Sequence, residues 1–230
     1  MEKLVYLLGD AEPGEVPRAR VDLRDRLLEV GPALDRLGAR QALCTVADLD
    51  DPEADRMTQL NRDGLIDASV SFWLESVDQR REVEKLLLPL AKRSAGYLVT
   101  ESVPRALQGH EPRFGERSPG VALVTTFPKP ERIDDETFYA RWHDSHTPLS
   151  LETHPLLQYI RNSVARVLTV GAPPFRGIVS ESVESPEIMA SPTAFYRSEE
   201  NRKRAVQDLL SFIDLDALST VLMSEYCLGP

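Results

Sequence analysis

The sequence repeats one order of predicted elements twice, and this repeat limits the possible folds more than any single motif does. Residues 3–9 (KLVYLLG) are short, apolar and ended by a glycine, which is typical of a strand. The elements predicted after it are a helix over 21–38 that is broken near Pro32, strands at 39–49 and 66–76, a helix over 78–93 and a strand at 96–103. The first half therefore has the order β-α-β-β-α-β.

The second half returns to the same order. Its predicted elements are a strand at 120–127, a helix over 134–146, strands at 157–170 and 176–185, a helical stretch within 192–212 and a strand at 219–228. Details agree as well, since ASVSFWLES in the first half parallels GIVSESVES in the second. Pro32 and Pro148 are both expected to interrupt the first helix of their half. These agreements indicate an internal duplication.

Each half is a split βαβ, ferredoxin-like unit, in which helices cover one face of a four-stranded sheet. The other face still carries apolar residues and needs a cover, which a second sheet can supply. We therefore predict an α+β fold of two tandem ferredoxin-like repeats that form an α/β barrel within one chain, with helices outside and a cavity between the sheets. The expected boundaries are 1–105 for the first repeat, 106–119 for a polar linker rich in glycine and proline, and 120–230 for the second repeat.

The charge and the apolar runs narrow the class of protein. Thirty-seven acidic residues against twenty-seven basic ones give a net charge of −10, which disfavours nucleic acid and anionic membrane surfaces as partners. No apolar run approaches the roughly 20 residues of a membrane-spanning helix, and the start of the chain lacks the apolar core of a signal peptide. Two cysteines, Cys44 and Cys227, are too few for a disulfide scaffold. We expect a cytoplasmic protein with both thiols in its core, although a single bridge stays open.

The richest motif is FYARWHDSHTPL, which runs from residue 138 to residue 149. Asp134 is the expected N-cap of its helix. On a helical wheel five rings fall within one arc, and they belong to Phe138, Tyr139, Trp142, His143 and His146. Large aromatic residues four apart are normally packing, so Phe138 and Trp142 are expected to form a core seam that also borders a bound substrate.

The second half resembles an EthD domain, a family of dimeric α/β-barrel proteins. The residues that carry the resemblance are Phe138, Trp142, His146 and Pro148, as F-x-x-x-W-x-x-x-H-x-P, and YIRNSV fits the family's second strand. Family members are usually single domains that pair to build the barrel. The resemblance implies ties to ether-degrading oxidative systems, or to aromatic polyketide pathways as decarboxylases, dehydratases or cyclases, and many such domains have no assigned activity.

The first half matches this family only in its layout. It has Gly31 and Pro32 where the second half has His146, Thr147 and Pro148. It is therefore expected to be a degenerate copy that lacks the histidine, so that any site chemistry belongs to the second half.

His146 is the first candidate for catalysis. We expect it in the last turn of its helix, where the helix C-terminus favours a protonated imidazole that can act in acid–base catalysis. Tyr139 is a candidate helper, and His143 is a weaker candidate because its position on the wheel leans toward solvent. The competing interpretation is that the His146 ring only bonds a carbonyl group in the turn before Pro148.

Substrate-binding candidates are Phe138, Trp142, Tyr159 and Arg161. Tyr159 and Arg161 share one face of their strand. Arg161 can hold a carboxylate, although a surface ion pair is the commoner fate of such a residue. A metal site at His143, His146 and His154 is disfavoured, because no carboxylate completes a ligand pattern. No glycine-rich phosphate loop, nucleophile elbow or CxxC motif occurs, so we expect no cofactor.

These observations predict a cofactor-independent enzyme of the lyase, cyclase or isomerase kind that uses His146 on an aromatic or polyketide-like small molecule. The alternative is a non-catalytic accessory protein that binds such a molecule for an oxidative degradation or biosynthetic pathway. Haem or quinone-forming oxygen chemistry stays a third option. Exposed helix faces also leave room for a further homodimer.

Overall fold

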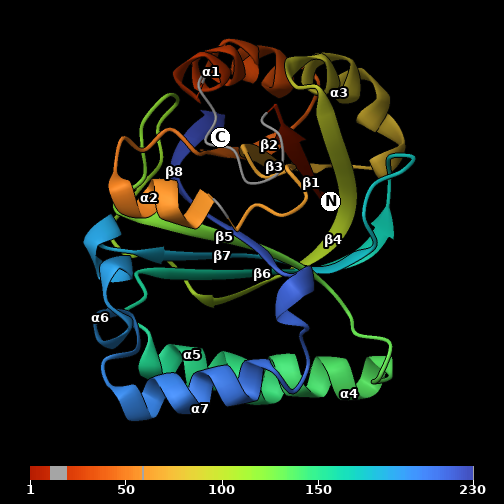
Figure 1. The fold of residues 1–230 in the computed structure, drawn as a ribbon. Helices are drawn as coiled ribbons and strands as arrows, with labels where there is room; N and C mark the ends of the chain where they lie inside the picture. Colours follow the sequence, from red (N-terminus) through yellow and green to blue (C-terminus); the bar gives the residue numbers. More distant parts are fainter. Residues whose placement is uncertain (11–19, 59, 230) are drawn as a thin grey trace.

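Eight strands close into a single antiparallel barrel in the computed structural model, which describes residues 1–10, 20–58 and 60–229 (Figure 1). The order of strands around the barrel is β1-β3-β2-β8-β5-β7-β6-β4, and β4 pairs with β1 to close it. The elements of the first half are β1 (Glu2–Gly9), α1 (Arg20–Arg36), β2 (Arg40–Val46), α2 (Pro52–Thr58), β3 (Ala68–Leu74), η1 (Val77–Gln79), α3 (Arg80–Leu87), η2 (Leu88–Leu90) and β4 (Arg93–Arg105).

The second half repeats this order. Its elements are β5 (Val121–Pro128), α4 (Asp135–Tyr139), the π-helical segment η3 (Ala140–His146), α5 (Thr147–Thr153), β6 (Gln158–Val167), β7 (Phe175–Val183), η4 (Pro186–Ala190), α6 (Pro192–Tyr196), α7 (Glu199–Leu209), η5 (Leu215–Ala217) and β8 (Ser219–Gly229). The predicted strands are all present. Helix α2 lies in a stretch for which the sequence predicted no element.

The barrel consists of two ferredoxin-like sheets that meet along two seams. The first half contributes β4-β1-β3-β2 and the second contributes β8-β5-β7-β6, which is the same order within each repeat. The seams are the antiparallel pairs β2–β8 and β4–β6. The predicted α+β barrel of two tandem repeats is therefore confirmed.

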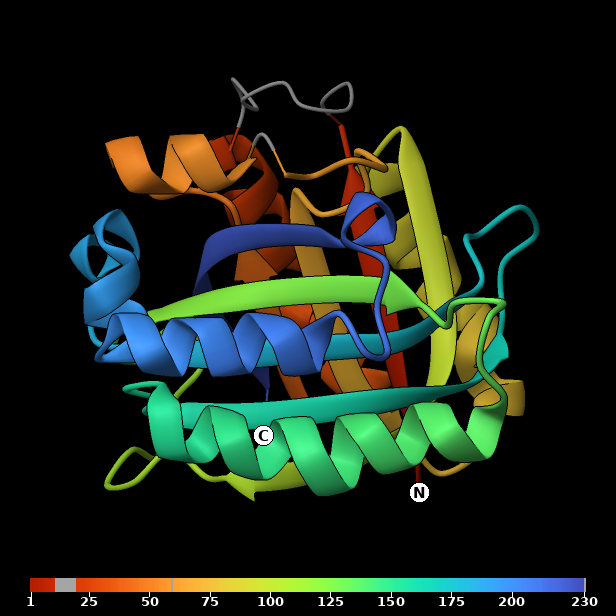
Figure 2. The same cartoon turned by 60° about the horizontal axis from the view of Figure 1, so that its bottom comes forward.

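Helices cover the outside of the barrel on two opposite sides (Figure 1). Helices α1 and α3 cover the sheet of the first half, while α4, η3, α5 and α7 cover that of the second. The turned view shows α4, η3 and α5 as one continuous rod, with α7 beside it (Figure 2). Helices α2 and α6 lie on the same flank of the molecule, so both repeats contribute to that flank.

The strands alternate between a helix-facing side and a barrel-facing side, as the period of a strand requires. Tyr6 and Phe72 stack on the helix side with ring centroids 5.8 Å apart, inside the core formed with α1 and α3. Trp73 points the other way and lines one mouth of the barrel. Phe72 and Trp73 are neighbours on β3, so the register of that strand sends the first to the helix side and the second to the barrel side.

The barrel interior is largely filled, and this corrects the expected location of the main cavity. Apolar side chains such as Tyr97, Val99 and Ile178 pack inside it. The spaces that remain there measure about 40 Å³ in the middle and about 240 Å³ at one mouth. Inward-facing residues of two sheets interdigitate in a barrel of this size, so little room is left between them. A cavity of about 360 Å³ lies instead between the second sheet and its helices.

Two further expectations meet different outcomes. Helix α1 runs unbroken past Pro32, so the predicted break is wrong. Both cysteines are buried free thiols, as expected.

The segment 106–119 pairs with β8, where Ser118 N donates to Glu225 O at 2.8 Å, and it borders the barrel mouth. Within the described residues, no helix has the length and apolar character to cross a bilayer.

Candidate active site

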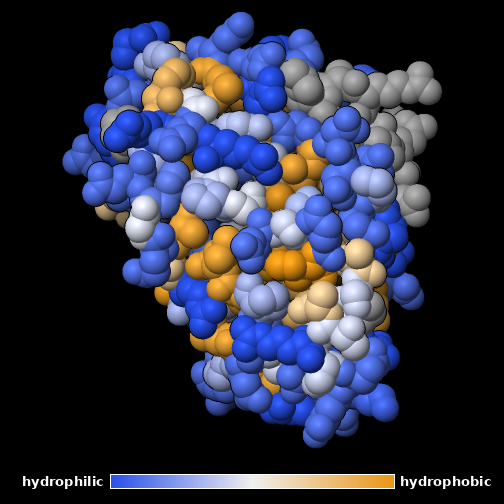
Figure 3. Space-filling model, turned by 90° about the vertical axis from the view of Figure 1, so that its left-hand side faces the viewer, coloured by the Kyte–Doolittle hydropathy of each residue, from blue (hydrophilic) through white to orange (hydrophobic). Residues whose placement is uncertain are grey.

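The largest cavity described above lies between the outer face of the second sheet and the helices that cover it. Its walls are mostly apolar and aromatic, and the principal contributors are Phe127, Trp142, Met189, Phe195, Leu209 and Phe212. Arg56 and Met57 of α2 reach it from the first repeat. The flank that carries α2 and α6 shows hydrophobic side chains framed by hydrophilic ones (Figure 3). A cavity of this kind is a typical site for a small apolar ligand.

The rod that forms one wall of the cavity does not end where the sequence predicted. Asp134 caps its start, because its side chain accepts a hydrogen bond from Thr137 N at 2.7 Å, as expected. The chain then widens into the π-helical segment η3 and continues through α5 to Thr153. Pro148 lies where η3 passes into α5, and the rod continues past it. His146 is therefore inside a long helical rod, and the expectation that it occupies a C-terminal turn is wrong.

His146 forms a hydrogen bond with a side chain on another helix. Its Nδ1 lies 2.8 Å from Oδ2 of Asp208, on α7. Ser145 Oγ also donates to this carboxylate. Burial acts to raise the pKa of Asp208, but the hydrogen bonds from His146 and Ser145 outweigh it and the pKa is lowered. An ionised Asp208 holds the proton on Nδ1, which leaves Nε2 as the nitrogen able to accept a proton in the cavity that His146 lines.

Trp142 and Tyr159 line the same cavity, as two of the predicted substrate-binding residues. The Trp142 ring packs edge-on against Phe127, with centroids 5.1 Å apart. Tyr159 is buried, and its hydroxyl lies 3.4 Å from Oγ1 of Thr147. Burial, and then the charge of Glu181, raise the pKa of Tyr159, so its hydroxyl stays a neutral donor at ordinary pH.

The structure places the other predicted site residues behind the cavity wall. Phe138 is fully buried in the core. Tyr139 packs on that core and lies under Arg176, whose guanidinium carbon is 5.6 Å from the ring centroid. Among the described residues Arg161 forms no ion pair, and it does not line the cavity. It donates a hydrogen bond to Thr147 Oγ1 at 2.7 Å.

His143 is also outside the cavity, but it does not point into solvent as the wheel suggested. It is partly buried, with Nε2 3.5 Å from Oγ of Ser163. Burial, and then the positive charge of Arg161, lower its pKa against the opposing effect of Asp144. The π-helical segment changes the number of residues per turn, so a wheel drawn for an α-helix misplaces the residues that follow.

Three residues that bear on the site were not among the predicted site residues: His154 and Glu181 line the cavity, and Asp208 contacts His146. Asp208 lay in a stretch predicted only as helical. His154 was considered solely as a metal ligand. Glu181 and Val179 are two residues apart and therefore share the helix-facing side of β7. This period of two is the signal that could have identified Glu181. In the described part of the chain, no three His, Cys, Asp or Glu side chains cluster in a way that could hold a metal ion.

Comparison with known proteins supports the architecture. No family model matches the chain, and no curated protein matches it either. Among solved structures, an anthrone oxidase-like protein superposes with a TM-score of 0.63 at 13% identity, covering 100% of this chain and 94% of that chain. A chlorite dismutase from Candidatus Nitrospira defluvii is similar at a TM-score of 0.49 and 10% identity, covering 99% and 92%.

The likeness shows the fold. The chain is an eight-stranded α/β barrel built from two repeats in one polypeptide, and most residues that line the cavity belong to the second repeat.

Proposed function

We propose that the cavity of the second repeat is the active site of a cofactor-independent enzyme that moves protons on an aromatic or polyketide-like small molecule. The observation that carries the proposal is the 2.8 Å contact between His146 and Asp208 at the edge of an apolar, aromatic-lined cavity. A carboxylate that fixes the tautomer of a histidine leaves the other ring nitrogen ready to act as a general base. Removal of a proton by a general base is a common first step of cofactor-independent lyase, cyclase and isomerase reactions.

Each residue then has a distinct role. His146 takes a proton from a carbon or oxygen acid of the ligand, and Asp208 positions its ring. Trp142 supplies a flat apolar wall, and the neutral hydroxyl of Tyr159 donates to a ligand oxygen. Thr147 stabilises this wall, because its Oγ1 donates a hydrogen bond to Trp142 O at 3.0 Å.

The remaining predicted residues support these groups from behind. Phe138 packs against Trp142 with ring centroids 5.7 Å apart, and Tyr139 lies on the same pair. Arg161 donates a hydrogen bond to Thr147, and the His143 ring packs against Trp142 at a tilted angle, with centroids 4.7 Å apart. In this proposal they are positioning residues and do not contact the ligand.

We also propose that the second repeat is EthD-like and the first a degenerate copy. The spacing of Phe138, Trp142, His146 and Pro148 supports this, since the first two pack in the core and the histidine lines the cavity. In the first repeat the residue two positions before Pro32 is Val30, so the place of His146 carries no imidazole.

A proton-exchange assay tests the catalytic role directly. The probe is 2-tetralone, a two-ring ketone whose C1 hydrogens exchange with solvent deuterium through an enolate, as NMR can follow. We expect the wild type to accelerate this exchange and His146→Gln to lose about 10²- to 10⁴-fold of that acceleration, the usual contribution of a general base. His110→Gln, a histidine substitution at the barrel mouth, is the matched control and should leave the rate unchanged.

Two results would change the conclusion. Full exchange activity in His146→Gln contradicts the assigned base. Binding of 2-tetralone by the wild type without any acceleration of exchange favours the alternative, a non-catalytic protein that carries such molecules.

A further inference from the structure

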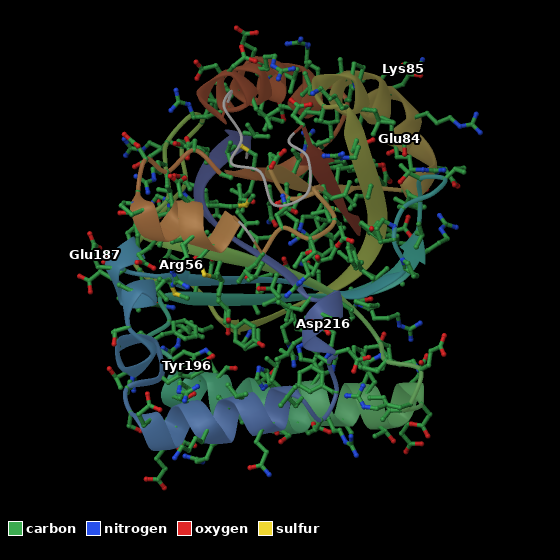
Figure 4. All side chains as sticks on the ribbon, viewed as in Figure 1. Arg56, Glu84, Lys85, Glu187, Tyr196 and Asp216 are labelled. Carbon is green, nitrogen blue, oxygen red and sulfur yellow. The ribbon has the colours of Figure 1, made fainter. Side chains whose placement is uncertain are left out.

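The end of the cavity away from His146 contains a second histidine, whose ring nitrogens form no hydrogen bond with the described residues. His154 is the C-cap of α5 and is 4% exposed. Its ring lies 4.2 Å from the Phe195 ring and 5.1 Å from the Tyr196 ring, centroid to centroid, and Tyr196 is on α6 (Figure 4). Neither ring nitrogen has a hydrogen-bond partner among the described residues. A buried imidazole normally bonds through at least one nitrogen, so this one lacks a partner.

The nearest charged group does not supply that partner. Oε1 of Glu181 is 3.6 Å from Nδ1 of His154, beyond hydrogen-bond distance. Glu181 is itself poorly exposed, with 12% of its side chain accessible, and His154 is its only ion-pair partner within the described residues. Its charge adds to the effect of burial in raising the pKa of Tyr196. Both members of the pair line the cavity, so a molecule in the cavity can reach them.

The spacing of the two histidines sets the shape of that molecule. His146 and His154 are eight residues apart along one helical rod, which corresponds to about 12 Å at 1.5 Å per residue. Helix α7 contacts the rod at His146 through Asp208 and near His154 through the ion pair of Arg204 with Glu152. Between these two contacts, α7 lines the cavity with the apolar residues Ala205 and Val206. The cavity therefore offers a histidine at each end of this apolar stretch.

We propose that His154, backed by Glu181, is a second polar anchor that binds the far end of the ligand. This inference rests on the proposed function and narrows its substrate class to extended aromatic molecules with a hydroxyl or carbonyl oxygen at both ends. His146 acts on one end, and His154 holds the other through a hydrogen bond. Glu181 is a positioning residue that favours an N–H on the side of His154 facing it.

Two probes of nearly equal size test the anchor by titration calorimetry. 2,6-Dihydroxynaphthalene has an oxygen at each end, and 2-naphthol has one. We expect the wild type to bind the diol about tenfold more tightly, the usual effect of one additional hydrogen bond. His154→Phe keeps the ring packing but removes both nitrogens, so the preference should disappear while 2-naphthol still binds. His154→Gln, which restores a donor and an acceptor, should recover part of it.

A thermal melt of the unliganded variants shows whether a loss of binding arises from unfolding. Because the His154 nitrogens are unpaired, His154→Phe should melt no lower than the wild type. Equal affinity of the wild type for both naphthols, unchanged in His154→Phe, overturns the second anchor and leaves the proposed function standing. Failure of the wild type to bind either naphthol overturns the proposed function as well, and with it this inference.

Discussion

The two repeats share one fold but use the space between sheet and helices in opposite ways. In the first repeat that space is filled by leucines of α1, among them Leu23, Leu27 and Leu34, packed on the stacked pair Tyr6 and Phe72. In the second repeat the same space holds a cavity of about 360 Å³. The comparison teaches that a duplicated unit can keep one copy as packing and open the other as a site, without any change in strand order.

The chemistry of the covering helices explains the difference. The sheet-facing side of α1 is aliphatic and packs into a closed core. The corresponding rod of the second repeat carries Trp142, His146 and His154, and these bulky or polar groups cannot fill the interface as leucines do. The charged partners of the two histidines, Asp208 and Glu181, come from α7 and β7.

Truncating one leucine in each repeat should give the largest difference in stability between the two repeats. Leu27 is fully buried, so we expect Leu27→Ala to lower the free energy of unfolding by about 2–5 kcal/mol. Leu209 already borders the open cavity, and Leu209→Ala should cost about 1 kcal/mol or less. Urea unfolding measures both. Equal losses would mean that the second interface is as tightly packed as the first.

Adding volume should give the reverse contrast. Ala42 is buried in the first core, and Ala42→Leu should cost about 1–3 kcal/mol through overpacking. Ala205 is buried but lines the cavity, so Ala205→Leu has space to occupy and should leave stability nearly unchanged. The same variant should weaken binding of 2-naphthol. A large loss of stability in Ala205→Leu would argue that the cavity closes in solution.

The hydrogen bonds to Asp208 should appear in the pH dependence of stability. Its pKa is lowered in the folded protein, so its contribution is present above the unfolded value of about 3.9 and is lost as pH falls through the folded value. Asp208→Asn should therefore be less stable than the wild type at pH 7 by about 1 kcal/mol, with the gap closing in acid. Asp216→Asn, at an exposed position (Figure 4), is the control and should show no such gap.

Substitution of His143 should have the smallest effect on stability, and here the substitution should stabilise the protein in acid. Its folded pKa is lowered, so the unfolded chain binds the proton more readily and the wild type loses stability as pH falls below about 6.5. His143→Gln removes this loss. The difference between the two proteins should stay below about 1 kcal/mol, because solvent screens a partly exposed group. A wild-type curve parallel to that of His143→Gln between pH 7 and pH 5 would contradict the lowered pKa.

Much of the fold could be predicted from the sequence because its signals are local. The apolar run of β1 and the alternation of β3 and β7 are visible in a few residues, and the repeated order then limits the topology. The position of the cavity could not be predicted, since it depends on how α7 and α6 sit over the sheet. Asp208 is 62 residues from His146, and no local pattern links them. The π-helical segment also moved His143 from its expected direction.

The central claim is that ligands enter the helix-covered cavity of the second repeat and not the barrel interior. The chain has two tryptophans, and each reports on one of these places: Trp142 lines the cavity, and Trp73 lines the barrel mouth. An NMR titration of the two indole N–H signals with 2-naphthol, assigned with Trp142→Phe and Trp73→Phe, measures both at once. We expect the Trp142 signal to shift to saturation while the Trp73 signal stays in place. A shift of Trp73 with Trp142 unchanged would contradict it.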